Sequence, residues 1–170
     1  MTLSRACAHL TNYTAAHESR THLTGPARFD FGPNHIEIDN RLAWLTGRLD
    51  AAWGDRAAYV HLTRDPEAVA QSFAARAQQG ILKAYRMEVL ARSRNKARAT
   101  PLIDYCRDYV ETVTRNIALF LRDKSHVMHM RLETMAEDFD TLAGRISAEG
   151  DLERARAELA IAHNATEKTP

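Results

Sequence analysis

The sequence predicts an α/β fold: a mostly parallel sheet of about four strands flanked by helices. Short segments rich in β-forming residues alternate along the chain with longer segments of helical period, as strands and their crossover helices do. The clearest change occurs where the apolar stretch 57–63 ends at Arg64-Asp65-Pro66 and a helical period follows. With 170 residues, 45% of them hydrophobic, the chain can bury the core of one domain, which we expect to span residues 1–170.

The first third of the chain predicts two strands between two helices. A helix over residues 1–10 is followed by the short β-capable piece 13–16 and by a loop marked by glycine and proline. Residues 35–39 alternate in polarity, as a half-exposed strand does. Residues 40–53 carry leucines at helical spacing, so we expect one amphipathic helix there, with Asp39 as its N-cap.

Residues 57–63 predict a strand that is buried on both faces, because they are apolar and rich in β-formers. Proline has no backbone N–H for the strand ladder, so Pro66 prevents the strand from continuing. A helix can begin at the same place, with Asp65 as its N-cap and Pro66 at its first position. Val69 and Phe73 then share one face of this helix.

The rest of the chain predicts mainly helices. Apolar residues recur at helical spacing after an interruption at Gln78-Gln79-Gly80, and one long helix has the strongest period. A short apolar segment late in the chain is the last strand candidate. The expected elements are helices over 81–94, 100–122, 135–146 and 151–163, a strand over 127–133, and a frayed tail over 164–170.

The charge balance argues against a general polyanion binder. Lysine and arginine number 23 and aspartate and glutamate 22, for a formal charge of +1, so no net field recruits nucleic acid or anionic lipid, and any anion site must be local. No apolar run is long enough for a membrane span. The two isolated cysteines, Cys7 and Cys106, fit a reducing compartment, and no charged-then-apolar leader is visible, so we expect a cytoplasmic protein.

Arg64 and Ser72 are candidate anion-binding residues. Arg64 ends a predicted strand, and Ser72 lies about two turns into the following helix. Open α/β sheets bind ligands at the carboxyl ends of their strands, and a helix N-terminus beside an arginine suits a phosphate. The alternative is that Arg64 is a surface residue paired with Asp65 or Glu67, and that Ser72 is an ordinary helix serine.

A resemblance to a known family bears on this choice. Residues YVHLTRDP (59–66), AVA (68–70) and SF (72–73) resemble the 3′-phosphate-binding segment of the sulfotransferases, which use 3′-phosphoadenosine 5′-phosphosulfate as co-substrate. The resemblance implies a P-loop-like fold and in-line transfer of a sulfuryl group to a hydroxyl or amine, without a metal. It also implies that Arg64 and Ser72 hold the donor's 3′-phosphate.

A general base is expected after the strand at 13–16. His17 and Glu18 follow it directly, and either could remove the acceptor's proton, as a histidine or glutamate does in several sulfotransferase branches. The alternative is that His17 hydrogen-bonds within a loop and that Glu18 pairs with Arg20. If neither is the base, Glu37 and Asp39 are the next candidates.

The beginning of the chain also resembles the sulfotransferases. Residues SRACAHL (4–10) are similar to the helix that follows the family's phosphate-binding loop. We therefore expect an N-terminally truncated domain that lacks the strand and loop for the 5′-phosphosulfate, and a chain that is inactive or nearly so in this form. An internal methionine taken for the start, or a deliberately shortened chain, would produce such a truncation, and a natural short variant is the alternative. A homodimer partner could cover the open sheet edge.

Two further motifs have competing interpretations. The basic run 92–98 could touch an anionic acceptor such as a glycan or a lipid headgroup, but a solvated loop between helices is the more frequent meaning of so short a run. His126 and His129 lack further ligands at matching spacing, so they are a poor zinc signal.

The acceptor, whether small molecule, glycan or lipid, cannot be identified from the sequence. Two other functions stay open: a non-catalytic nucleotide-binding or structural remnant of this fold, and a P-loop-type phosphotransferase. The phosphotransferase is disfavoured because the chain has no Gly-Lys-Ser/Thr loop.

Overall fold

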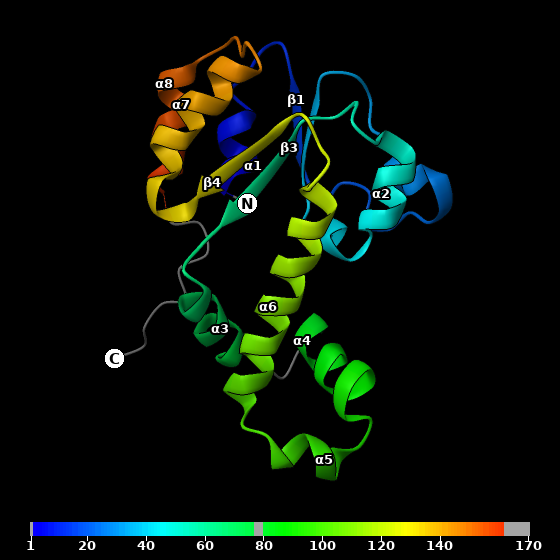
Figure 1. Ribbon diagram of the computed structural model, residues 1–170. Coiled ribbons are helices and arrows are strands. Elements are labelled where there is room, and N and C mark those ends of the chain that lie inside the picture. The colour runs from blue at the N-terminus through cyan, green and yellow to red at the C-terminus, as the bar shows by residue number, and fades with distance from the viewer. Residues whose placement is uncertain (1, 77–79, 162–170) are drawn as a thin grey trace. The chain divides into compact units, whose positions relative to one another are not determined.

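The computed structural model describes residues 2–76 and 80–161, and the chain divides into two compact units (Figure 1). The first unit contains Met1–Leu62 and Lys124–Pro170, and the second contains Thr63–Asp123. Each unit has its own hydrophobic core. The two units are therefore described one at a time.

The first unit contains all four strands and most of the short helical segments. Its elements are α1 (Thr2–Cys7), β1 (Thr14–His17), the 3₁₀ helix η1 (Gly25–Phe29), β2 (His35–Ile38), the 3₁₀ helix η2 (Asn40–Trp44), α2 (Thr46–Trp53), β3 (Tyr59–Thr63, whose last residue begins the second unit), β4 (Val127–Arg131), the 3₁₀ turn η4 (Leu132–Thr134), α7 (Met135–Arg145) and α8 (Leu152–Leu159).

The second unit is helical. Its elements are α3 (Pro66–Ala74), α4 (Gly80–Ala84), the π-helix η3 (Tyr85–Ala91), α5 (Arg94–Ala99) and α6 (Leu102–Leu121). The α/β character and the four predicted strands are confirmed.

The strands form two small parallel sheets, so the expectation of one sheet of about four strands is wrong for the described residues. In the first sheet β1 pairs with β2, in a register that runs from Thr14 opposite His35 to His17 opposite Ile38. In the second sheet β3 pairs with β4, and the Tyr59 N–H donates to the His126 carbonyl at 2.8 Å. All four of these strands are therefore edge strands, whereas a single four-stranded sheet would have had two central strands.

β3 also differs from its prediction, because it is not buried on both faces. Val60 is 38% exposed and Leu62 is 39% exposed, whereas Met128 and Met130 of the partner strand are buried in the core. A strand with one neighbour and only partial cover leaves its apolar side chains open to solvent.

The core of the first unit joins three helices to the sheets. α1 packs against α8, and α7 packs against both β4 and α8. The most deeply buried side chains of this core are Ala6, Cys7, Met130, Phe139 and Ala155. Burial raises the pKa of the Cys7 thiol to about 11, so this cysteine stays protonated and behaves as a small apolar side chain.

A set of backbone-directed bonds ties the chain after α1 to the loop between α7 and α8. Leu10 and Gly150 form an antiparallel bridge. The Asn12 side chain donates to the Ser147 carbonyl and accepts from the Glu149 N–H, both at 2.9 Å. The Tyr13 hydroxyl donates to the Ile146 carbonyl at 2.9 Å. These contacts join segments that are more than 130 residues apart in sequence.

The core of the second unit is built where α3 and η3 meet α6. The Tyr109 ring makes edge contacts with Phe73 at 5.0 Å and with Tyr85 at 5.3 Å between ring centroids. The Tyr85 hydroxyl donates to the Asp108 carboxylate and lies 3.0 Å from the Thr112 hydroxyl. Burial, and after it the bond to Asp108, raises the pKa of Tyr85.

Three predicted elements are corrected. The helix expected over 40–53 is divided into η2 and α2, and the helix over 81–94 becomes α4 followed by a π-helix. The basic run 92–98, interpreted as a loop, contains the helix α5, which begins because the Ser93 hydroxyl accepts from the Lys96 N–H at 3.2 Å. Gln78 and Gln79 of the predicted interruption and the predicted tail 164–170 lie outside the described residues.

Over residues 2–76 and 80–161, no helix combines the length and the apolar character that crossing a bilayer requires.

We predict that Gly150→Ala destabilises the first unit. Gly150 has a φ of +133°, and a Cβ there would lie 2.4 Å from the His9 carbonyl oxygen and 2.9 Å from the Leu10 Cα. The backbone strain alone should lower the free energy of unfolding by roughly 1–3 kcal/mol, and the overlap with backbone atoms adds to this loss. Denaturant unfolding measures the change.

The matched control is Gly144→Ala in α7. A Cβ at Gly144 meets nothing within 4 Å, so alanine should leave stability unchanged or raise it by up to about 1 kcal/mol. Equal unfolding midpoints for the two variants would contradict the role given to Gly150.

Candidate functional site

The turn after β3 has the predicted geometry. β3 ends at Thr63, the Asp65 carboxylate accepts from the Ala68 N–H at 2.7 Å, and Pro66 is the first residue of α3. The predicted N-cap is thus confirmed. Asp65 fixes where the strand ends, and Arg64 is the residue between the strand and the cap.

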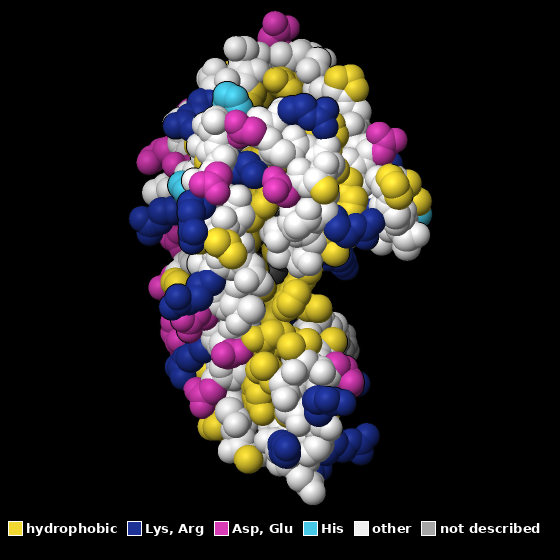
Figure 2. Space-filling model, turned by 45° about the vertical axis from the view of Figure 1, so that its right-hand side comes forward, with side chains coloured by type: hydrophobic (Ala, Val, Ile, Leu, Met, Phe, Trp, Pro, Cys, Tyr) yellow, Lys and Arg dark blue, Asp and Glu magenta, His cyan; other side chains and the backbone are white. Residues whose placement is uncertain are grey.

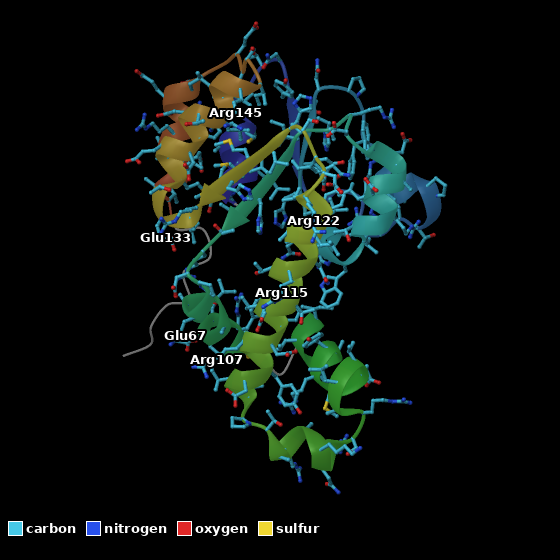
Figure 3. All side chains as sticks on the ribbon, in the orientation of Figure 1. Glu67, Arg107, Arg115, Arg122, Glu133 and Arg145 are labelled. Atoms are coloured by element: carbon cyan, nitrogen blue, oxygen red, sulfur yellow. The ribbon has the colours of Figure 1, made fainter. Side chains whose placement is uncertain are left out.

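Arg64 is exposed, and its guanidinium takes part in no ion pair among the residues that the structure describes. The alternative pairing with Glu67 does not occur. Glu67 instead accepts from Arg107 of α6 at 2.8 and 2.9 Å, a bidentate contact that joins α3 to α6 (Figure 3). Arg64 thus lies on the surface, without an ion-pair partner in the described part of the chain.

Ser72 lies on α3 beside a second cation. Its hydroxyl accepts from the Arg76 guanidinium at 3.0 Å, and its carbonyl accepts from the same group at 3.2 Å. Arg76 was not considered in the sequence analysis, although it stands four residues after Ser72 and so shares its helix face. A phosphate that accepts from the Ser72 hydroxyl would also meet this charge.

The parallel pairing of β1 and β2 brings their carboxyl ends to one edge. His17 ends β1 with an exposed side chain. Glu18 follows in a left-handed backbone conformation, with a φ of +52°, and forms an ion pair with Arg41 from the turn after β2. The predicted alternative for Glu18, pairing with Arg20, is wrong, because Arg20 donates to the Ala27 carbonyl at 2.9 Å.

The Glu37 carboxylate is held by neighbouring hydrogen-bond partners. It accepts from the Ser19 N–H at 2.7 Å and from the Ser19 hydroxyl at 2.6 Å, and it lies 3.0 Å from the His35 ring. Burial raises the pKa of Glu37, but the hydrogen bonds from His35 and Ser19 outweigh it and hold the pKa below its ordinary value. A carboxylate with these partners links β2 to the turn after β1.

Asp39 is likewise engaged. It pairs with Arg28, and both side chains are almost fully buried, with exposures of 0% and 4%. Its other oxygen accepts from the Arg41 N–H at 2.8 Å, which confirms Asp39 as an N-cap, although of η2. Of the four acidic or basic candidates at this edge, His17 and Glu18 are thus better placed than Glu37 and Asp39 to meet a ligand.

Two histidines face each other on the second sheet. The rings of His61 on β3 and His129 on β4 have centroids 5.7 Å apart. Burial, and after it the proximity of His129, lowers the pKa of His61. Within the described ranges, no group of three or more histidine, cysteine or carboxylate side chains is arranged to hold a metal ion.

The predicted site residues belong to different units. His17 and Glu18 lie in the first unit, and Arg64 and Ser72 lie in the second. Comparisons of the chain with protein-family models, with curated proteins and with solved structures gave no match.

We predict that Glu37 makes the first unit acid-sensitive. Its pKa is lower in the folded chain than in the unfolded chain, so its contribution is complete above the unfolded pKa, at about 4.3, and is lost as the pH falls through the folded pKa. The stability difference between the wild type and Glu37→Gln should therefore be largest near neutral pH and shrink below about pH 4.

Denaturant unfolding of both proteins across this pH range tests the prediction. Glu149→Gln is the control, because Glu149 has an exposed side chain in a loop. If the wild type and Glu37→Gln differ by the same amount at every pH, the role given to Glu37 is wrong.

Proposed function

We propose that this chain binds the 3′-phosphate of 3′-phosphoadenosine 5′-phosphosulfate and serves in sulfuryl transfer to a hydroxyl or amine. The observation that carries the proposal is the turn after β3, where an exposed Arg64, the Asp65 cap and Ser72 on α3 follow in the order that the sulfotransferase segment has. The acceptor is a small molecule, a glycan or a lipid.

The chemistry of these residues suits a phosphate monoester. The arginine fork matches two phosphate oxygens, and a serine hydroxyl can donate to a third. The first N–H groups of α3 add donors and a partial positive charge. Arg76 supplies a further cation beside Ser72, at 3.0 Å from its hydroxyl.

The transfer step needs a base and no redox partner. The acceptor oxygen or nitrogen attacks the donor's sulfur, the bond from sulfur to the bridging phosphate oxygen breaks, and adenosine 3′,5′-bisphosphate leaves. Glu18 is the proposed base, because its carboxylate lies at the strand edge and is oriented by Arg41; it takes the acceptor's proton. His17 is the alternative for this role.

Our first prediction here concerns binding. Arg64→Ala and Ser72→Ala should each weaken the binding of adenosine 3′,5′-bisphosphate far more than the binding of adenosine 5′-monophosphate. The reason is that only the bisphosphate carries the 3′-phosphate that Arg64 and Ser72 would hold. The loss of a charge-assisted bond should raise Kd by roughly tenfold to a hundredfold for Arg64→Ala. Calorimetry on folded variants measures both ligands.

Two controls keep this test specific. Gln71→Ala changes the exposed neighbour of Ser72, and Arg115→Ala removes an exposed cation of α6 whose partner is Glu111 on the same helix. Both should leave the two affinities unchanged. Equal losses of affinity for the two nucleotides would show that Arg64 and Ser72 do not hold the 3′-phosphate. Selective binding of the bisphosphate without sulfuryl transfer would favour a non-catalytic nucleotide-binding module.

A second prediction concerns the base. In a preparation that releases adenosine 3′,5′-bisphosphate from the donor in the presence of an acceptor, Glu18→Gln should lower kcat by roughly 10² to 10⁴ and leave donor affinity nearly unchanged. His17→Gln, made in parallel, should have a small effect. A large loss in His17→Gln with normal turnover in Glu18→Gln would assign the proton to the histidine instead.

A further inference from the structure

The second unit contains a basic pocket that is separate from the residues of the proposed donor site. The pocket has a volume of about 610 Å³ and lies between the continuous helix of α4 and η3 and the short helix α5. Four cations line it: Lys83, Arg86, Arg94 and Arg98. Figure 2 shows lysine and arginine side chains over this end of the second unit, in the lower part of the view.

The helices present these cations in two pairs. Lys83 and Arg86 are three residues apart on one wall, and Arg94 and Arg98 are four residues apart on the other. Residues at these spacings share a helix face, so each pair acts as one patch of positive charge. The chain turns between the walls at Arg92, which has a left-handed φ of +51° and closes the π-helix by donating to the Met87 carbonyl at 3.0 Å.

Among the residues that the structure describes, the pocket lining carries a net positive charge. Glu88 is the one carboxylate in that described lining, and none of the four cations forms an ion pair within the same residues. The Nε of Arg86 is buried without a hydrogen-bond partner, although the guanidinium lies 5.9 Å from the centroid of the Tyr105 ring. The Arg86 side chain is thus partly removed from water, and a charge-assisted hydrogen bond to an oxyanion is stronger in such surroundings than at a fully exposed arginine.

We propose that this pocket binds an acidic oligosaccharide with at least two sulfate or carboxylate groups. Two patches of charge on facing walls match a ligand with two separated anionic groups, and the volume is within the range of small-ligand sites. Glu88 can accept hydrogen bonds from sugar hydroxyls, which a ligand made only of phosphates does not offer. Among the described lining residues none is aromatic, so the pocket offers no stacking platform for a nucleobase.

The sequence offered the basic run 92–98 as a possible contact for an anionic acceptor. Of this run, Arg94 and Arg98 line the described pocket, and Lys83 and Arg86 join them from a helix earlier in the chain. The binding does not depend on the transfer reaction proposed above, so it is tested without any donor nucleotide.

The first arm of the test is calorimetry with a heparin-derived tetrasaccharide. The double variant Arg94→Ala/Arg98→Ala should weaken binding by roughly a hundredfold, and the salt dependence of Kd should become less steep. The control, Arg122→Ala/Arg154→Ala, removes the same number of exposed cations outside the pocket and should weaken binding by less than about threefold. Equal losses in the two double variants, or no binding by the wild type, would overturn the proposal.

The second arm tests the chemical class and guards against misfolding. Arg94→Lys/Arg98→Lys keeps the charge and should bind about tenfold more weakly than the wild type, since lysine lacks the bidentate fork. Glu88→Gln removes a negative charge from the pocket but keeps a hydrogen-bond acceptor, so it should strengthen the binding of inorganic tripolyphosphate more than that of the tetrasaccharide. Tighter binding of tripolyphosphate than of the tetrasaccharide by the wild type, or a larger gain for the tetrasaccharide than for tripolyphosphate in Glu88→Gln, would exclude a site built for acidic sugars.

Discussion

The hydrogen bond that the Asp65 carboxylate accepts from the Ala68 N–H, 2.7 Å long, determines how the chain is arranged around the candidate site. It satisfies one of the free amides at the start of α3 and so fixes the residue at which β3 gives way to a helix. Arg64 is left outside both elements and exposed. The rotation of α3 that follows from this start places Ser72 and Arg76 on one face. A cap of this kind contributes roughly 0.5–2 kcal/mol to stability, yet it sets the positions of Arg64, Ser72 and Arg76, the residues proposed to bind the phosphate.

Capping explains why so much of the secondary structure could be predicted from the sequence. Asp39 and Asp65 act within three residues of themselves, so their roles are visible in the local pattern. The charged partners of Glu18 and Asp39 were not predictable in the same way. The Glu18–Arg41 pair depends on the register of β1 and β2, and the Arg28–Asp39 pair crosses a loop that has no periodic signal. The separation of the strands into two sheets depends on long-range packing, which no local pattern records.

The acidic residues at the edge of the first sheet divide by burial. Asp39 is removed from water and compensated by an equally buried Arg28, and Glu37 is held by Ser19 and His35. Such carboxylates are poorly placed to serve a reacting group, because both oxygens of each already accept a hydrogen bond. Glu18 keeps partial exposure and a single charged partner. Satisfied groups and available ones therefore lie a few residues apart, and the hydrogen-bond partners distinguish them where residue type does not.

The π-helix has a consequence for how the length of the chain can vary. A π-turn holds one more residue than an α-helical turn, so it is equivalent to an insertion that the helix has absorbed. Deleting one residue from Tyr85–Ala91 would restore the α-helical period and rotate everything after it by about 100° around the helix axis. Arg94 and Arg98 would then no longer face Lys83 and Arg86 across the pocket. The number of residues in this segment is therefore constrained by the pocket that it closes.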